Sequence, residues 1–386
     1  MRKKIIKFFA ICIVFFLVGG ISSVISEHYI FPKLSTNSFF SKIGFLKKLN
    51  ENVTVINKTE EITVKEDTSV NKVASQAASS VVNILSISKN SPSNLAKKLS
   101  AKEIQKSGTG VIVTNDGMII TYRTAIIENN AEYQVLLFNG SVSPAKLVAI
   151  DEFTNLAYLK TEATNLPAIS FSNSLDLFPG KKVIAIGNSF GEYQNSYASG
   201  LLSKINKVFN ISGETLSTSG KMEGILETDF SDIADYVGGP VIDYGGELVG
   251  IIGSVVIDNK PKYFEIPSNF VKDSLELAVN DGLKNRPDFG AYYVPITKAY
   301  SIINNLPKDR GALIFSASGK QGLAVIAGSP AEKAGIKIND IIMRVNDQEI
   351  NLDNSLSNTI NRFKKGDEIK ILVLRDGKEM EISVKL

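Results

Sequence analysis

Residues 107–113 read Ser-Gly-Thr-Gly-Val-Ile-Val, and the turn Asn115-Asp116-Gly117 and a second apolar run follow them at once. An Asp-Gly pair between two apolar runs is a strong short-range signal of a β-hairpin. Short apolar runs separated by further turn dipeptides recur up to about residue 258. Many short strands at such spacing predict a sandwich or a barrel, and this stretch holds no long amphipathic helix that would favour a doubly wound sheet.

The composition excludes several classes of function. The chain has 386 residues, of which 44% are hydrophobic and 22% charged, and this length is enough for two or three globular domains. The Lys and Arg residues behind the net charge of +3 are spread along the chain, so we expect no nucleic-acid partner. Cys12 is the only cysteine and His28 the only histidine, which excludes an intramolecular disulfide and a His/Cys metal cluster. The sequence has no Walker loop and no strand-linked dinucleotide-binding glycine motif, so we expect no cofactor and no metal site.

Residues 1–26 predict a short cytoplasmic stub and a transmembrane anchor. Cationic residues precede an uncharged apolar run from Phe8 to Ile25, which is about long enough to cross a bilayer as a helix. The positive-inside rule places the N-terminus in the cytoplasm and the bulk of the chain outside it, as a single-pass protein of the cell membrane. A cleaved signal peptide is the alternative, although the run is long and ends without a clear small-x-small site.

Four segments are predicted to follow the anchor. Residues 27–69 are polar with little pattern and read as a tether. Residues 70–265 carry the strand signals, and residues 266–285 carry apolar positions at helical spacing that predict a connector. Residues 286–386 form a mixed unit of domain size, with a helix expected over 352–363 and two final strands around an Asp-Gly turn.

Five segments resemble, in order, those of the HtrA-type serine proteases. The first resembles the glycine-rich strand and tight hairpin that lead to the catalytic histidine in that family. The second resembles the segment that carries the aspartate, the third a turn typical of the family, the fourth the strand after that turn, and the fifth the region of the nucleophile. The segments are Ser107–Thr121, Asp151–Lys160, Ala185–Gly191, Ser199–Ser203 and Glu227–Ile251. The resemblance implies a mainly β fold, in which a trypsin-like double β-barrel is followed by an α+β PDZ domain.

This chain departs from the family pattern at the positions of the catalytic triad. Thr124 stands where the family has histidine, Asn155 where it has aspartate and Val237 where it has the nucleophilic serine. Valine has no lone pair to attack a carbonyl, and threonine accepts no proton near neutral pH. Asp235 stands where a glycine would help to form the oxyanion hole, and its charge would oppose a developing negative charge.

Other residues could in principle supply a replacement site. Ser231 and Asp232 lie near the degenerate nucleophile motif, and Lys204 and Lys207 follow the preceding strand, so a Ser-Lys dyad can be drawn. The simpler interpretation is that the serine is a loop residue and that the lysines are solvated. His28 lies beside the anchor and is poorly placed to act as a base.

The last hundred residues resemble a PDZ domain of the HtrA type. Phe289, Gly290, Ala291 and Tyr292 match its entry loop, whose backbone N–H groups receive a peptide carboxylate, and Gly328–Ile342 matches its most recognisable string. The resemblance implies a groove between the strand after the loop and the 352–363 helix, where a peptide adds as an extra strand. The alternative is a PDZ fold in which Phe289 and Ala291 are core residues beside a closed groove.

Three functions remain open on the sequence alone. The first is a membrane-anchored scaffold or sensor without a catalytic triad, which binds peptide C-termini or unfolded segments in extracytoplasmic protein quality control. The second is a serine endopeptidase that uses an unrecognised nucleophile, and the third is a structural protein of the cell envelope. The resemblance also allows a homo-trimer, or a hetero-oligomer with an active paralogue.

Overall fold

The computed structural model of the chain describes residues 18–20, 22, 71–89, 105–188, 195–214 and 216–386, and residues Val73–Leu386 form one compact unit. The tether predicted at 27–69 lies outside the described residues, as does most of the predicted anchor. None of the helices among the described residues is long and apolar enough to span a membrane.

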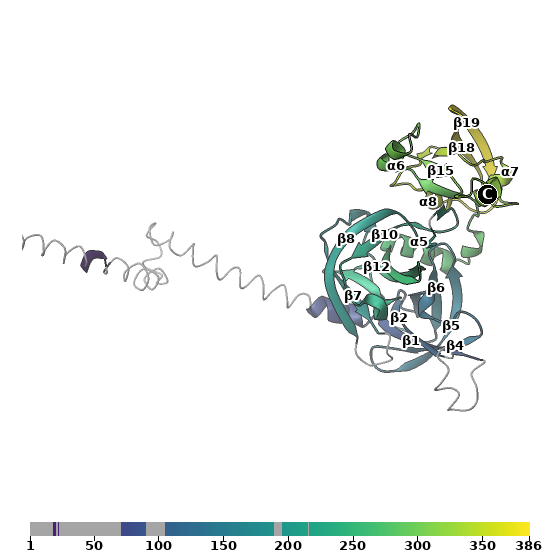
Figure 1. Ribbon diagram of the computed structural model, residues 1–386. Coiled ribbons are helices and arrows are strands. Elements are labelled where there is room, and N and C mark those ends of the chain that lie inside the picture. The colour runs from purple at the N-terminus through teal and green to yellow at the C-terminus, as the bar shows by residue number, and fades with distance from the viewer. Residues whose placement is uncertain (1–17, 21, 23–70, 90–104, 189–194, 215) are drawn as a thin grey trace, which may run out of the picture. The chain divides into compact units, whose positions relative to one another are not determined.

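Six strands close the first barrel, and the predicted hairpin at 107–117 lies in it (Figure 1). Val111 pairs with Ile120 across that hairpin, and Gly117 takes the positive φ of +95° that its turn requires. A helical segment at residues 71–78 precedes the barrel. The strands, in the barrel order β1-β2-β3-β6-β5-β4, are β1 (Val81–Ser88), β2 (Gln105–Ile112), β3 (Met118–Tyr122), β6 (Leu156–Thr161), β5 (Val142–Asp151) and β4 (Ala131–Leu136).

Six further strands close a second barrel, so the double barrel expected from the sequence is confirmed. Its core is aliphatic, and Tyr122 of the first barrel meets its Phe264 edge to face, with ring centroids 6.1 Å apart. The strands, in barrel order, are β10 (Glu223–Thr228), β13 (Lys260–Pro267), β12 (Leu248–Ile257), β11 (Pro240–Asp243), β7 (Lys182–Gly187) and β8 (Ser196–Asn210).

Helix α5 (Ser268–Val279) follows the second barrel at the predicted connector. Its buried side chains include Val271, Leu275 and Ala278, which are spaced by three or four residues and therefore share one face. The other side of the helix is exposed at positions such as Lys272. The helical spacing in the sequence therefore predicted a real amphipathic element.

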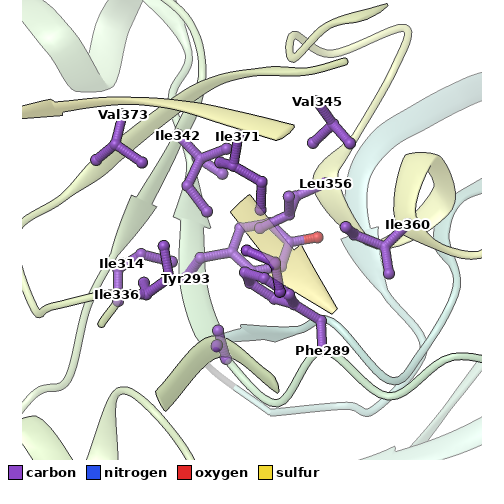
Figure 2. Packing of buried hydrophobic residues seen from close by; sticks show 14 of the residues in the cluster. Phe289, Tyr293, Ile314, Ile336, Ile342, Val345, Leu356, Ile360, Ile371 and Val373 are labelled. Atoms are coloured by element: carbon purple, nitrogen blue, oxygen red, sulfur yellow. The ribbon is translucent and has the colours of Figure 1, made fainter. Parts of the chain in front are cut away.

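The third sheet belongs to the PDZ domain, and it packs a large aliphatic and aromatic core (Figure 2) and a second, smaller apolar cluster around Leu313. The hydroxyl of Ser329 accepts the N–H of Glu332 and so caps α7 (Pro330–Lys333), as the Ser-Pro pair predicts. In the sequence, helix α6 (Lys298–Ile303) comes between the first two strands of the domain. The strands are β14 (Tyr292–Pro295), β15 (Ala312–Ile314), β16 (Ile341–Val345), β17 (Gln348–Glu349), β18 (Glu368–Arg375) and β19 (Lys378–Lys385).

The helix expected over 352–363 is shorter than predicted. It is α8 (Leu356–Ile360), and Ser355 caps it by accepting the N–H of Asn358. The side-chain oxygen of Asn351 accepts the N–H groups of Asp353 and Asn354, so the preceding residues form a turn instead of helix. Local side-chain hydrogen bonds overrode the apolar spacing on which the prediction rested.

A buried ion pair holds the first barrel, α5 and the entry to the PDZ domain together. The carboxylate of Asp151 is fully buried and accepts from Arg286, at 2.6 Å, and from the hydroxyls of Thr154 and Ser274. The guanidinium of Arg286 also lies 4.9 Å from the ring centre of Phe153. Loss of one partner would leave a buried charge without compensation.

We therefore expect Arg286→Met to lower the free energy of unfolding by about 3–5 kcal/mol, because the carboxylate of Asp151 loses its cation. Urea unfolding followed by circular dichroism measures this. The matched control is Lys284→Met, which removes the exposed ion pair with Asp281 and should have little effect. Equal stabilities of the two variants would contradict a structural role for the buried pair.

The buried carboxyl group of Glu265 predicts a pH-dependent stability. Its side chain is 1% exposed and accepts from the hydroxyl of Thr228 at 2.7 Å, and burial raises its pKa from the ordinary 4.5 to about 8. Between these values the unfolded chain releases the proton while the folded chain keeps it. The free energy of unfolding should therefore fall by about 1.4 kcal/mol per pH unit between pH 5 and 8 from this group alone.

Glu265→Gln should remove this part of the pH dependence, because the amide does not titrate. Urea titrations at a series of pH values measure the slope, and exposed Glu247→Gln is the matched control. An unchanged slope in Glu265→Gln would show that this carboxyl group titrates normally.

Candidate functional site

A cleft of about 370 Å³ brings together residues of both barrels. Thr124 and Val237, two of the three residues that the resemblance aligns with a catalytic triad, line it, as does Asp235. Its other lining residues are Lys106, Ser107, Gly108, Ala125, Ala234, Ser254 and Tyr263. The sequence therefore identified residues that the fold does gather at one place.

Thr124 lies in the 3₁₀ turn η3 (Arg123–Ala125) directly after β3. Its side chain is exposed, and its hydroxyl oxygen lies 3.0 Å from that of Ser254 on β12. A hydroxyl in this place can donate or accept a hydrogen bond but cannot take up a proton from a nucleophile near neutral pH. The hydroxyl groups of Thr124 and Ser254 therefore make the cleft polar, but neither can act as a general base.

Val237 follows the 3₁₀ turn η5 (Ile233–Tyr236), and its half-buried isopropyl group packs against the core of the second barrel. Its N–H points to the carbonyl oxygen of Ala234 at 3.5 Å. The next residue, Gly238, donates to the carbonyl oxygen of Ile252 at 2.8 Å. Both N–H groups are therefore directed at the protein's own backbone, and the exposed residue Asp235 lines the same cleft as Val237.

Asn155 has a φ of +59°, a left-handed conformation that asparagine tolerates well. Its amide N–H donates to the hydroxyl of Tyr122 at 3.2 Å. Its amide oxygen accepts from Lys221 at 2.8 Å and from Arg123 at 3.3 Å. Among the described contacts of this side chain none leads to Thr124, so the amide serves a cationic cluster and not the residue at the histidine position.

That cationic cluster was not predicted from the sequence. Arg123 binds both carboxylate oxygens of Glu128 at 2.8 Å and one of Glu152 at 2.7 Å, and Arg123 lowers the pKa of Glu128. Lys221 also donates to the backbone and side chain of Glu152, and burial lowers its pKa. Lys221 belongs to a loop that is distant in sequence from Glu152 and Asn155, so no local sequence pattern could predict its contacts with them.

The Ser-Lys dyad drawn from the sequence finds no support in the described contacts. Lys207 pairs with Asp353 of the PDZ domain, and Ser231 is exposed. Lys106 is a different lysine that lines the cleft, and burial lowers its pKa. Among the described residues, no group of three His, Cys, Asp or Glu side chains is suited to hold a metal ion.

The four residues predicted to bind peptide lie at the start of the PDZ sheet. The side chains of Phe289 and Ala291 are fully buried in the core, so neither side chain can contact a ligand. Gly290 has a φ of +78°, and a side chain there would collide with Ser329. Tyr292 donates its N–H to Ala324 at 2.8 Å, which leaves the backbone of Ala291 facing the opposite edge of the strand.

Comparisons with known proteins agree with this architecture. A family model described as "Trypsin-like peptidase domain" matches residues 108–251, and one described as "PDZ domain" matches residues 298–386. The "Probable periplasmic serine endoprotease DegP-like" of Chlamydia muridarum is 32% identical over 72% of this chain and 53% of its own length. The "Serine protease Do-like HtrA" of Bacillus subtilis is 31% identical over 72% of this chain and 63% of its own length.

Solved structures show the same fold. A structure titled "HtrA-type protease AlgW with tripeptide" superposes with a TM-score of 0.63 at 22% identity and covers 82% of this chain and 96% of that chain. A second, titled "HtrA-type protease AlgWS227A with decapeptide", gives a TM-score of 0.60.

This chain spans only about half the length of the Chlamydia relative, so the likeness extends to the shared domains and leaves the activity of the whole relative a separate question. The two domain matches, the order of the motifs and the two closed barrels agree with one another. The chain belongs to the HtrA family of proteins, in which a trypsin-like peptidase domain precedes a PDZ domain.

Proposed function

We propose that this chain is a non-catalytic HtrA-family protein that captures peptide segments through its PDZ domain. The observation that carries the proposal is the content of the cleft: a threonine hydroxyl paired with Ser254, an isopropyl group at Val237, and no imidazole. The single histidine of the chain, His28, lies far from these positions in the sequence. A covalent serine mechanism needs a nucleophile and a base in contact, and this cleft offers neither at the family's positions.

Electrostatics at the cleft oppose the remaining part of the mechanism. An oxyanion hole needs backbone N–H groups that are free to point at a developing negative charge. The N–H group of Val237, at the position where the family's nucleophile contributes to that hole, points to the carbonyl oxygen of Ala234 at 3.5 Å, and Asp235 adds a carboxylate to the cleft. Replacing Val237 by serine would therefore restore the nucleophilic hydroxyl but neither the base nor the oxyanion hole.

The PDZ domain then carries the function. Its entry loop and β14 provide an edge to which an extended peptide can add as a strand, with a carboxylate at the loop. The titles of the AlgW structures name a bound tripeptide and decapeptide, which supports peptide binding by analogy of fold. We infer that the ligands are peptide C-termini or unfolded polypeptide segments.

We infer the place of action from the N-terminal sequence. The uncharged run from Phe8 to Ile25 after a cationic start supports a membrane anchor with the two domains on the extracytoplasmic side. The name of the Chlamydia relative describes that protein as periplasmic, which agrees with the extracytoplasmic side of the membrane. A scaffold or sensor in extracytoplasmic protein quality control fits both observations.

A serine endopeptidase with an unrecognised nucleophile is the competing function. Lys106 with its lowered pKa and the hydroxyl of Ser254 line the same cleft, and a lysine can act as the base for a serine. Within the described part of the chain, no hydrogen bond joins these two side chains. A covalent probe decides between the two functions directly.

We expect a fluorophosphonate probe for serine hydrolases to leave the purified full chain unlabelled, and unfolded casein to remain uncleaved. Val237→Ser should also stay unlabelled, because it gains a hydroxyl without a base. The Bacillus subtilis HtrA relative serves as the positive control. Stoichiometric labelling that Ser254→Ala or Lys106→Met abolishes would establish the competing function instead.

A further inference from the structure

The edge of the PDZ sheet where a peptide would add is already occupied. β14 pairs with β15 on one edge, and on its other edge it pairs with β9 (Ser217–Thr218), a two-residue strand from the loop between β8 and β10 of the second barrel. The PDZ sheet therefore ends in a strand that the peptidase domain supplies. A peptide ligand that adds to a sheet as a strand needs an unpaired edge, and β9 takes that place here.

The register of this pairing imitates a bound C-terminal peptide. The strands are antiparallel, with Thr218 opposite Tyr292 and Ser217 opposite Tyr293. Ser219 then donates its N–H to the carbonyl oxygen of Ala291 at 3.0 Å. The N–H of Ala291 donates to the hydroxyl oxygen of Ser219, also at 3.0 Å. A hydroxyl oxygen thus takes a backbone N–H of the loop that resembles a carboxylate-binding loop.

The same segment reaches the helix on the other side of the groove. After a turn at Gly220 and Lys221 the chain returns as β10, and Asn358 of α8 exchanges two hydrogen bonds with the backbone of Glu223, of 2.5 Å and 3.1 Å. Tyr293 of β14 donates its hydroxyl proton to the carboxyl group of Glu223, and the N–H of Ser357 donates to that hydroxyl oxygen at 3.2 Å.

The segment therefore contacts both β14 and α8, the two elements expected to form the peptide groove. The side chains of Ser217, Ser219 and Glu223 are 5%, 1% and 1% exposed. Figure 2 shows the side chain of Tyr293 beside those of Leu356 and Ile360 of α8 in the core of the domain. Ser219 contacts the sheet edge at Ala291 directly, through one backbone hydrogen bond and one to its hydroxyl oxygen.

We propose that residues 217–223 are a built-in occupant of the PDZ groove, and that a C-terminal peptide binds by displacing Ser217–Ser219 from the edge of β14. The proposal rests on the proposed function, since it concerns how the same groove takes its ligand. The groove is self-inhibited, and the affinity measured for a ligand is reduced by the fraction of molecules in which the segment is docked.

The chemistry of the segment makes it displaceable. Ser217, Thr218 and Ser219 bring small polar side chains, so the docked strand gains little from apolar burial and depends on backbone hydrogen bonds. A ligand carboxylate would replace the neutral hydroxyl of Ser219 at the N–H of Ala291 and form a charge-assisted bond, which is stronger. The ligand class is therefore an extended peptide with a free C-terminal carboxylate and small polar residues before it.

The segment is also held from its own side, which sets the threshold for displacement. The side-chain amide of Asn210 on β8 donates to the carbonyl oxygens of Thr218 and Lys221, both at 3.1 Å. These two bonds fix the turn that presents the strand to the PDZ domain. A ligand must compete with a strand whose ends are tied, and such a strand has a high effective concentration at the groove.

The test uses a fluorescein-labelled peptide Gly-Glu-Thr-Leu-Ser-Thr-Ser, the sequence of residues 213–219, with a free C-terminal carboxylate. Fluorescence anisotropy measures its binding to the purified full chain in detergent. Ser219→Pro loses both bonds to Ala291 and should bind the peptide about tenfold or more tightly than the unaltered chain. Ser212→Ala, in the same loop, is the matched control and should bind as the unaltered chain does.

A cross-link tests the same inference without weakening the fold. In a Cys12→Ser background, Thr218→Cys with Tyr292→Cys places two thiols on directly opposed residues of β9 and β14. Oxidation should form the disulfide and abolish peptide binding, and reduction should restore it. Failure of the disulfide to form, or full peptide binding with the disulfide closed, would overturn the proposal.

The outcomes separate this inference from the function on which it rests. Equal, measurable affinity for the unaltered chain and Ser219→Pro would show an open groove, so that self-occupancy is wrong while peptide capture stands. If neither the peptide with a free carboxylate nor the same peptide with a C-terminal amide binds to any variant, peptide capture itself is wrong. Loss of binding on amidation in Ser219→Pro supports both.

Discussion

The pairing of β9 with β14 is the interaction on which the functional interpretation depends. Two residues of the peptidase domain complete the sheet of the PDZ domain, and the serine that follows them satisfies the backbone of Ala291. The turn after this strand carries Lys221, whose ammonium group donates to the amide oxygen of Asn155. One short segment therefore contacts both the PDZ edge and the position that resembles the catalytic aspartate.

The cleft shows which parts of a protease motif serve the fold and which serve chemistry. A side chain at Gly238 would collide with Thr121 and with the backbone of Thr109, and one at Gly239 would collide with the backbone of Ile186. The Gly-Gly pair is therefore needed to pack the two barrels, whatever residue precedes it. The packing around Gly238 and Gly239 does not depend on which residue stands at position 237, so this part of the fold places no demand on the chemistry of the cleft.

Buried polar groups set the conditions under which this architecture is stable. The carboxylate of Asp151 has a cation, Arg286, and several hydrogen-bond donors in contact. Glu265 and Glu223 have no cation in contact among their described hydrogen bonds, and burial raises the pKa of each to about 8. The same interior therefore holds one carboxylate that is compensated and two carboxyl groups that burial keeps protonated at neutral pH.

The sequence predicted the elements whose causes are local. The hairpin at 107–117 follows from its Asp-Gly turn, and the start of α7 follows from the Ser329-Pro330 cap. The helix before Phe363 was predicted too long, because nothing in the apolar spacing reveals that Asn351 forms a turn. Most of the predicted anchor lies outside the described residues, so it stays a prediction.

The parts of the candidate site that the sequence did not predict all depend on contacts between distant segments. β9 has two residues and no apolar alternation, so no periodicity marks it as a strand. The contact of Lys221 with Asn155 joins a loop of the second barrel to a turn of the first. The groove was predicted from Phe289 to Tyr292, but its occupant was visible only once the two domains were placed together.

Amide hydrogen exchange followed by mass spectrometry tests most directly whether this protein works through a groove that its own chain fills. The full chain is compared alone and with a saturating carboxylate peptide. The account predicts that the amide of Ser219, which donates to the carbonyl oxygen of Ala291, exchanges slowly in the chain alone and quickly with peptide, while that of Ala291 stays protected in both. Rapid exchange of the Ser219 amide in the chain alone would contradict the account.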